Sequence, residues 1–279
     1  TGTGTACGSN NIITNCNTVS GYYNLCVVGS STLPNTGNQV INCHAQDFYF
    51  YGIYCTYQNG VVVRGNLVDR PNRTTLSTFY GIYIMTQSTN ALVENNRIRN
   101  PFAQLLTSGS TAYGIYSTSD GALGTENKYY NNIISDMKSD GIIYGFYLSG
   151  ADFVKVYHNT VSLDYAGSLS GTTYGIFNTG TLGGIDVRNN IVSITRGGSG
   201  TKYCLYYSNA GTISNKNVLY LNSPAGLNYH GYYLGAQATF ANWQAVNANA
   251  FDQQSVAANP LYFSPATNDY TPQELLFNN

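Results

Sequence analysis

One four-residue motif, aromatic-Gly-apolar-aromatic, recurs along this chain at a nearly constant interval, and this repeat constrains the fold more than any other feature. The third positions of successive copies are 29, 33, 31, 30 and 29 residues apart. Five copies are complete and a sixth has Cys204 in place of Gly: 51–54, 80–83, 113–116, 144–147, 174–177 and 203–206. A period of this length is typical of repeat proteins in which each unit stacks on the next.

A second motif, two alternating small or apolar positions followed by a bend and then Asn-x-apolar, lies between the copies of the first. Its asparagines are Asn17, Asn66, Asn96, Asn132, Asn159, Asn190 and Asn217. Each repeat thus offers at least two short strands with period-2 alternation, separated by Gly, Ser, Thr and Asn rather than by helical patterns. A propeller blade needs about 40 residues or more, which is longer than this interval.

These patterns predict an all-β chain folded as a right-handed parallel β-helix of about 8 coils. Equivalent strands would pair in parallel, so that each inward residue lies over its counterpart in the next coil. The seven asparagines would then form a ladder in which each side-chain amide bonds to backbone and to the neighbouring amides. We expect the coils to span residues 1–235 and a capping segment to span 236–279.

The Asn-x-apolar and Gly-Ile-Tyr repeats resemble those of parallel β-helix repeat proteins, the pectin-lyase-like superfamily that includes pectate lyases and chondroitinase B. The resemblance covers about residues 10–235 and implies a fold, with little information on activity. The tail, with Trp243, Asp252–Val256 and Asn259–Phe263, resembles the closing segment of β-helix regions in large secreted and surface proteins of Bacteroidota-type bacteria.

The tail is expected to cover the last coil, because an open end would expose unpaired strand edges and an apolar cross-section. Thr239 is the predicted N-cap of a short helix carrying Phe240 and Trp243, the one Trp of the chain. No comparable cap is visible before Asn10. We therefore expect the N-terminal end to join further coils or to self-associate.

Charged residues make up only 9% of the chain, and twelve basic and thirteen acidic side chains leave a net charge of −1. Phosphate binding needs a concentrated basic patch, so nucleic acid is not an expected partner. No stretch is apolar enough to insert into a membrane. The composition and the resemblance together predict an extracellular or cell-surface location.

The six cysteines include no CxxC pair, and no metal site or cofactor is expected. An even number permits disulfides in an oxidising compartment. Small buried residues stacked between coils are the other interpretation, and the sequence does not choose between the two. The cysteines are Cys7, Cys16, Cys26, Cys43, Cys55 and Cys204.

The first candidate site is an aromatic stripe. If the third motif position points inward, alternation places the fourth outside, where the rings would form a long strip at coil spacing. Aromatic faces with polar edges suit sugar rings or another protein surface; shielding of the sheet by Tyr is the alternative. The predicted ligand-binding residues are Tyr54, Tyr83, Tyr116, Tyr147, Phe177 and Tyr206.

The second candidate is a polar cluster on the Asn-motif strands. A polysaccharide lyase needs a cation against the uronate carboxylate, for which Lys155 or Arg188 is suited, and a base, for which Tyr157 or His158 is suited. An ordinary exposed charged patch is the alternative. A third group, Asp69, Arg70, Arg73, Glu94, Arg97 and Arg99, is expected to form a solvated salt-bridge network or to bind an anionic glycan.

The chain lacks the residue sets that polygalacturonases, pectate lyases and alginate or chondroitin lyases are known by. We therefore expect a non-enzymatic adhesin or stalk module that presents a Tyr-rich face to a polysaccharide, a cell-surface glycan or a sister subunit. The alternatives are a purely structural spacer and a lyase or glycoside hydrolase acting on an acidic polysaccharide.

Overall fold

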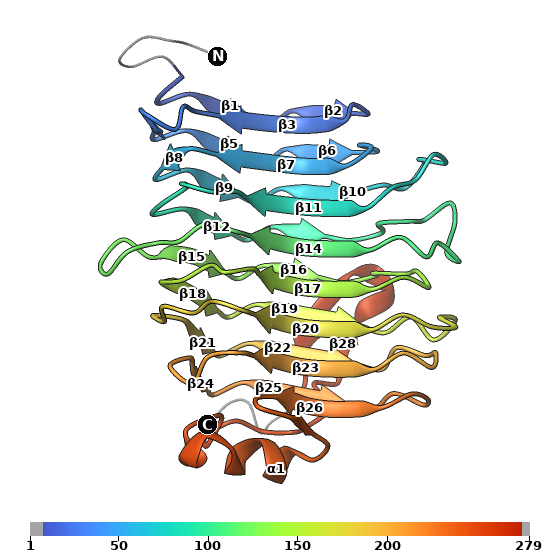
Figure 1. The fold of residues 1–279 in the computed structure, drawn as a ribbon. Helices are drawn as coiled ribbons and strands as arrows, with labels where there is room; N and C mark the ends of the chain where they lie inside the picture. The colour runs from blue at the N-terminus through green and yellow to red at the C-terminus, as the bar shows by residue number, and fades with distance from the viewer. Residues whose placement is uncertain (1–7, 275–279) are drawn as a thin grey trace.

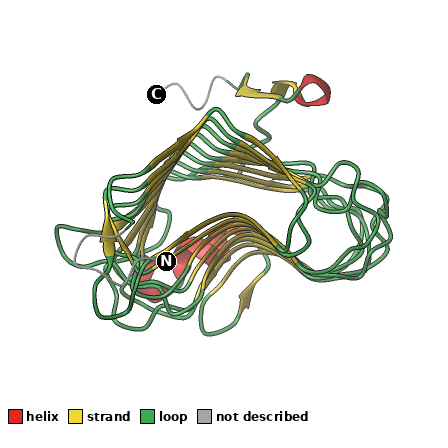
Figure 2. Ribbon diagram, turned by 90° about the horizontal axis from the view of Figure 1, so that it is seen from above, coloured by secondary structure: helices red, strands yellow, loops and turns green. Residues whose placement is uncertain are grey.

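The computed structural model describes residues 8–274 and shows a right-handed solenoid of eight stacked coils, as the repeat predicted (Figure 1). Each coil contributes one strand to each of three parallel sheets. Seen along the axis, the first and second sheets meet at a tight corner, and longer loops join them to the third (Figure 2).

The first sheet is built from strands of three or four residues. Its strands, in spatial order, are β1 (Ile12–Thr14), β5 (Gln39–Ile41), β9 (Val62–Arg64), β12 (Leu92–Glu94), β15 (Asn127–Tyr130), β18 (Val154–Tyr157), β21 (Asp186–Arg188) and β24 (Ile213–Asn215).

The second sheet follows the corner in each coil. Its strands are β2 (Asn17–Val19), β6 (His44–Gln46), β10 (Leu67–Asp69), β13 (Arg97–Ile98), β16 (Ile133–Ile134), β19 (Thr160–Leu163), β22 (Ile191–Ile194) and β25 (Val218–Leu221).

The third sheet holds the longest strands and carries the aromatic motif. Its parallel strands are β3 (Tyr23–Val28), β7 (Tyr51–Thr56), β11 (Phe79–Ile84), β14 (Ala112–Ser117), β17 (Ile143–Leu148), β20 (Thr173–Asn178), β23 (Lys202–Tyr207) and β26 (Asn228–Tyr232), and the short antiparallel β27 (Ala236–Gln237) completes it. A separate small pair, β4 (Asn35–Thr36) and β8 (Gln58–Asn59), joins the first loops.

The core is a set of apolar stacks that run along the axis. In the third sheet Ile53, Ile82 and Ile115 are register partners and are fully buried. In the first sheet Val63 and Val93 are likewise register partners and fully buried. Inward residues thus lie over one another because the strands pair in parallel without slippage.

The corner between the first and second sheets contains the asparagine ladder. The Nδ2 of each buried asparagine donates to the Oδ1 of the next at 2.9–3.1 Å, from Asn66 to Asn217. The residue before each ladder position has a positive φ, and it is usually Asn or Gly, which tolerate this conformation best. The ladder satisfies amides that a tight buried corner would otherwise leave unpaired.

One predicted ladder residue is wrong by one position. Asn17 is the register partner of His44 and is exposed, so it lies just after the corner rather than in it. The ladder position of the first two coils is held by Cys16 and Cys43, and the backbone N–H of Cys43 donates to Oδ1 of Asn66 at 2.8 Å.

The C-terminal end is closed by α1 (Phe240–Ala245), whose N-cap Thr239 accepts a hydrogen bond from the backbone N–H of Asn242. Trp243 is fully buried beneath it, stacked on Phe251, and fits because Gly231 of the last coil has no side chain. A 3-10 turn (Asn247–Asn249) follows α1.

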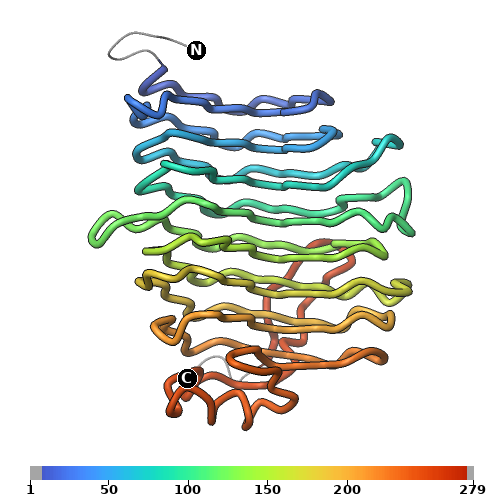
Figure 3. The backbone as a smooth tube through the Cα atoms, in the orientation of Figure 1, coloured from blue at the N-terminus to red at the C-terminus, as the bar shows by residue number. Residues whose placement is uncertain are grey.

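The residues after the cap do not cover the last coil. The chain runs back along the outside of the solenoid and forms a hairpin from β28 (Tyr262–Ser264), a 3-10 turn (Pro265–Thr267) and β29 (Asp269–Pro272), as Figures 2 and 3 show. Arg97 Nη1 donates to the carbonyl of Asn268 at 2.6 Å, and the hydroxyl of Tyr270 donates to Asp136. The second half of the predicted capping segment is therefore a strap beside the coils.

Candidate functional site: a two-column aromatic face

The outward surface of the third sheet carries two parallel columns of aromatic rings. Column 1 comes from the first motif position and column 2 from the fourth, and almost all of the rings are half-buried. Column 1 is Tyr23, Tyr51, Tyr80, Tyr113, Tyr144, Tyr174, Tyr203 and Tyr229, and column 2 is Tyr54, Tyr83, Tyr116, Tyr147, Phe177, Tyr206 and Tyr232.

The sequence pattern identified column 2 but missed column 1 as a surface feature. Strict alternation would have turned the first and fourth motif positions to opposite faces. Instead Gly52 and Ile53 are both buried, so the strand departs from alternation and both flanking tyrosines point outward. A Cβ on Gly52 would lie 2.5 Å from Val68 Cγ1 and 2.6 Å from the carbonyl oxygen of Gly81, which is why this position requires glycine.

The rings of column 1 stack face to face along the axis. Neighbouring centroids are 4.7–5.4 Å apart, with interplanar angles of 6–29°. Offset stacking of this kind is favourable beyond the buried area alone. The ring faces are consequently covered by one another. The surface offers ring edges and phenol hydroxyls, and not the flat aromatic faces expected from the sequence.

The hydroxyls of the two columns differ in their partners. In column 2, the hydroxyl of Tyr54 bonds to Met85 Sδ and that of Tyr83 to Thr118 Oγ1, and Tyr116 is paired with Ser149. Within residues 8–274 no protein group hydrogen-bonds the hydroxyls of column 1 from Tyr51 to Tyr203. Column 1 therefore displays a row of phenols, one per coil, that are free to bond to a ligand.

Within residues 8–274 the strands of the aromatic face expose no ionic group. Lys202 is the single charged residue in the eight parallel strands of this sheet, and its buried Nζ donates to the carbonyls of Gly198 and Ala225. Burial, followed by the neighbouring tyrosines, raises the pKa of Tyr54 and Tyr206 to about 12. The same two causes raise the pKa of Tyr80 and Tyr113. The phenols are thus neutral donors at physiological pH.

The loops beside this face are held by buried arginine side chains that donate to backbone carbonyls, and not by salt bridges. Arg70 is fully buried between the rings of Phe48, Phe79 and Phe102, and its guanidinium donates to three backbone carbonyls. Arg196 bonds in the same manner to the carbonyls of Ser139, Gly141 and Gly171, which lie in two successive loops. Burial lowers the pKa of Arg70 to about 9 and that of Arg196 to about 10.

The residues predicted for a lyase lie together on the outer face of the first sheet, but the two cations among them already form salt bridges with carboxylates. Lys155 Nζ lies 3.1 Å from Glu126 Oε1, and Arg188 Nε lies 2.7 Å from Asp186 Oδ1. The hydroxyl of Tyr157 donates to the other oxygen of Asp186 at 2.7 Å. Both cations therefore already have carboxylate partners.

The two predicted bases are adjacent residues in different surroundings. Burial, and then the hydrogen bond to Asp186, raises the pKa of Tyr157, so this phenol is protonated and acts as a donor. His158 is exposed at the positive-φ position of the corner, where the other coils mostly carry Asn or Gly. Its ring meets Tyr157 edge-on at 6.4 Å.

The third charged group is dispersed over the solenoid. Asp69 is buried and accepts from His44 Nε2 at 2.8 Å and from Arg99 Nε at 3.3 Å, on the second sheet. Glu94 pairs with Arg64 on the first sheet instead. Arg70 lies in the core and Arg97 holds the C-terminal strap, so no common anion site is formed.

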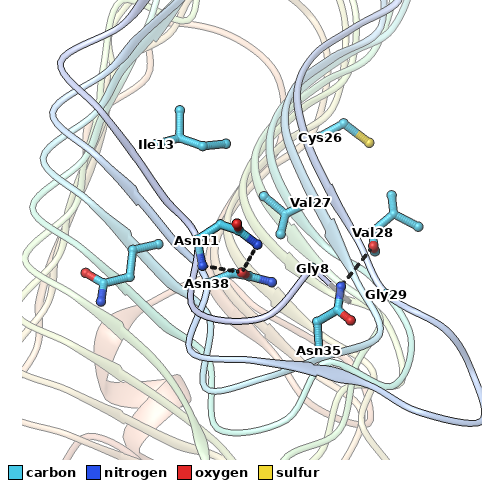
Figure 4. Close-up of a pocket in the computed structure, with 10 residues that line it drawn as sticks. Gly8, Asn11, Ile13, Cys26, Val27, Val28, Gly29, Asn35 and Asn38 are labelled. Carbon is cyan, nitrogen blue, oxygen red and sulfur yellow. Dashed lines mark hydrogen bonds between the residues drawn. The ribbon is translucent and has the colours of Figure 1, made fainter. Parts of the chain in front are cut away.

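A hollow near the first coil is lined by Gly8, Ile13, Val27, Asn35 and Asn38 (Figure 4). Asn11 bonds there to Oδ1 of Asn38. Across residues 8–274 no cluster of three or more His, Cys, Asp or Glu side chains is placed to hold a metal ion. In the same part of the chain no helix has the length and apolarity needed to span a membrane.

Comparison with known proteins identifies the fold family alone. Neither the search of curated proteins nor the search of solved structures found a match. The family model described as "Right handed beta helix region" matches residues 2–192, well over half of the chain. Together with the three parallel sheets and the asparagine ladder, this match shows that the chain belongs to the right-handed β-helix family.

Proposed function

We propose that this chain is a non-enzymatic, secreted or cell-surface carbohydrate-binding module of adhesin or stalk type. Column 1 binds a neutral, extended polysaccharide that lies along the solenoid axis. The observation that carries the proposal is the row of unpartnered phenol hydroxyls on the outer face of the third sheet.

The spacing of the row supports this orientation. Column 1 advances about 5 Å per coil, as stacked parallel strands require, and this is close to the advance per sugar in a ribbon-like polysaccharide. A chain lying along the axis would therefore meet one phenol per sugar. A chain lying across the axis would meet one or two.

The absence of ionic groups from the strands of this face favours a neutral glycan over the uronate polymer considered from the sequence. A buried carboxylate needs a cation or several donors to offset its desolvation. A sugar hydroxyl needs only donors and acceptors of its own kind, and each phenol supplies one of each.

The enzymatic alternative has less support. The first-sheet cluster pairs Lys155 with Glu126 and Arg188 with Asp186, and Tyr157 is a hydrogen-bond donor. A lyase reaction there would first have to break these pairs. A screen of uronate polymers for unsaturated products tests this alternative directly. The relation to the pectin-lyase-like superfamily and the bacterial origin suggested by the tail remain predictions.

The test compares two triple variants. Tyr113→Phe/Tyr144→Phe/Tyr174→Phe removes three free hydroxyls of column 1 and keeps the ring stack. Tyr54→Phe/Tyr83→Phe/Tyr116→Phe makes the same chemical change in column 2, where all three hydroxyls already have protein partners. Binding to cellulose, mannan, xylan and chitin is measured by depletion from solution and by calorimetry with oligosaccharides of increasing length.

The column 1 variant should lose roughly a hundredfold in affinity, since each hydrogen bond contributes about 1 kcal/mol. The column 2 variant should stay within a few-fold of the parent protein. Affinity should rise with oligosaccharide length up to about the number of coils. Equal losses in both variants, or tighter binding to uronate polymers than to neutral ones, would contradict the proposal. Reversible self-association that only the column 1 variant abolishes would indicate a sister subunit as the partner.

A further inference from the structure

The asparagine ladder stops at the third coil, and two cysteines continue it to the N-terminal end. Asn17 and His44 are register partners, so the residues before them, Cys16 and Cys43, are stacked neighbours at the ladder position. The backbone confirms this contact, since the N–H of His44 donates to the carbonyl of Cys16 at 2.8 Å. The structure records both side chains as free thiols.

The two thiols point into the same corner. Cys43 is buried, and its Sγ lies 3.3 Å from the carbonyl oxygen of Ile41 and 3.6 Å from that of Ile13 in the coil above. The Sγ of Cys16 lies 3.3 Å from the carbonyl of Thr14. The thiols are close enough that Cys16 alters the acidity of Cys43. Stacked parallel residues are about 4.8 Å apart at Cα, within the range that a disulfide spans.

No other described cysteines are neighbours in this way. Cys26 is the register partner of Tyr54 on the outer face. Cys55 lies between Val27 and Ile84, and Cys204 lies in the seventh coil at the glycine position of the motif. Cys7 lies outside the described residues. The adjacent pair is thus specific to the first two coils.

We propose that Cys16 and Cys43 are a dithiol that forms an inter-coil disulfide and locks the first coil onto the second under oxidising conditions. A low-molecular-weight disulfide such as oxidised glutathione serves as the oxidant. The thiolate of Cys16 attacks one sulfur of the oxidant, which forms a mixed disulfide and releases one glutathione thiolate. The thiolate of Cys43 then attacks Sγ of Cys16 and releases the second glutathione.

The reaction is balanced. The protein loses two electrons and two protons, the S–S bond of the oxidant breaks, and two glutathione thiols form. Attack starts at Cys16, the more exposed of the two. Burial raises the pKa of the Cys43 thiol, which makes it the slower first nucleophile.

The first coil is where such a bond would matter most. Within residues 8–274 its three strands pair with the second coil alone, and Ile12 and Val19 are 60% and 58% exposed. Edge coils of a solenoid open more readily than inner ones. A covalent link at the corner joins strands β1 and β2 to the second coil, where the asparagine ladder gives no side-chain contact.

The experiment uses the full chain, reduced and then treated with oxidised glutathione, alkylated, and digested without reductant. Peptide mass mapping should find the Cys16 and Cys43 peptides joined, with the loss of two hydrogens. Hydrogen exchange of the amides in residues 12–28 should slow by about tenfold or more on oxidation, while amides near the seventh coil should not change. Cys26→Ser should behave as the parent protein does, and Cys43→Ser should show neither effect.

Four results would overturn the proposal. Both thiols could remain open to alkylation, the reaction could stop at glutathionylated Cys16, or either cysteine could be linked to Cys7. A Cys16–Cys43 bond that leaves exchange in the first coil unchanged would refute the lock. All four outcomes are read from the parent protein, so the test does not depend on a variant that folds.

Discussion

Asp252 is the residue whose replacement tests most directly how the coils are joined to the cap. It is fully buried, and its carboxylate accepts four hydrogen bonds. Oδ1 accepts from Asn217 Nδ2 at 2.8 Å and from Ser255 Oγ at 2.6 Å. Oδ2 accepts from Trp243 Nε1 at 2.8 Å and from Ser214 Oγ at 2.7 Å. This one side chain therefore ends the asparagine ladder and holds the capping tryptophan.

The expected losses follow from which donors can turn elsewhere. The two serine hydroxyls can rotate to other acceptors, whereas the indole N–H of Trp243 and the amide of Asn217 are fixed. Asp252→Ala leaves the indole N–H of Trp243 without an acceptor and leaves Asn217 Nδ2 with the longer 3.3 Å contact to Ser214 Oγ in its place, so it should lower the free energy of unfolding by about 3 kcal/mol. Asp252→Asn keeps the shape and one acceptor oxygen, so one fixed donor faces an NH₂ group and the loss should be about 2 kcal/mol.

Urea unfolding followed by circular dichroism measures both values, with hydrogen exchange in β24 and β25 to detect local opening of the last coil. Asp120→Asn is the matched control, because Asp120 is exposed and accepts one backbone hydrogen bond; its change should stay below about 1 kcal/mol. If Asp252→Asn unfolds at the urea concentration of the parent protein, the carboxylate is not the link between ladder and cap, and the reasoning fails.

Two further predictions concern the ladder and the tyrosines. Asn132→Ala removes two hydrogen bonds donated by the side chain, to Asn159 and to the carbonyl of Val93. It also removes the acceptor of the backbone N–H and of the Nδ2 of Asn96, so the free energy of unfolding in urea should fall by about 3 kcal/mol. Asn131→Gly, at the neighbouring exposed position with positive φ, is the control and should change stability by less than about 0.5 kcal/mol. Burial in the folded state raises the pKa of Tyr54 and Tyr206 from the ordinary tyrosine value of 10.0 to about 12. The folded state therefore binds more protons than the unfolded state above about pH 10, and the stability from these groups should be lost as pH rises from about 10 to 12. Urea midpoints over this range, with tyrosinate absorbance recorded in parallel, check the second prediction. Midpoints that stay constant or rise as the pH increases would contradict it.

The repeat predicted the fold because a parallel solenoid converts a sequence interval directly into a spatial neighbour. Once Ile53 and Ile82 are placed in adjacent coils, every other pair in the third sheet follows from the same register. The N-cap of the terminal helix and the burial of Trp243 were also predictable, since Thr239 and the apolar residues after it form a local pattern.

The wrong or missing predictions concern residues where the 30-residue period or the inward–outward alternation of a strand is interrupted. Asn17 was assigned to the ladder because it fits the Asn-x-apolar motif, and only the register shows that Cys16 holds the ladder position of this coil. Asp252 was not singled out, because the cap has no repeat to compare it with. Column 1 was missed because the buried Gly52–Ile53 pair interrupts alternation, which a count of two residues per period does not reveal.

The candidate site depends on a property that neither composition nor spacing reveals, namely which tyrosine hydroxyls already have protein partners. Both columns are built of tyrosine at the same interval, except for Phe177 in column 2, and in both the rings of neighbouring coils are in contact. The loops beside column 2 supply Thr118 and Ser149 as partners, whereas no protein group in the described chain takes up the column 1 hydroxyls. A ligand gains most from donors that the protein leaves unsatisfied, because bonding to them breaks no protein contact. The functional asymmetry of the face thus arises from the irregular loops, although its period arises from the regular strands.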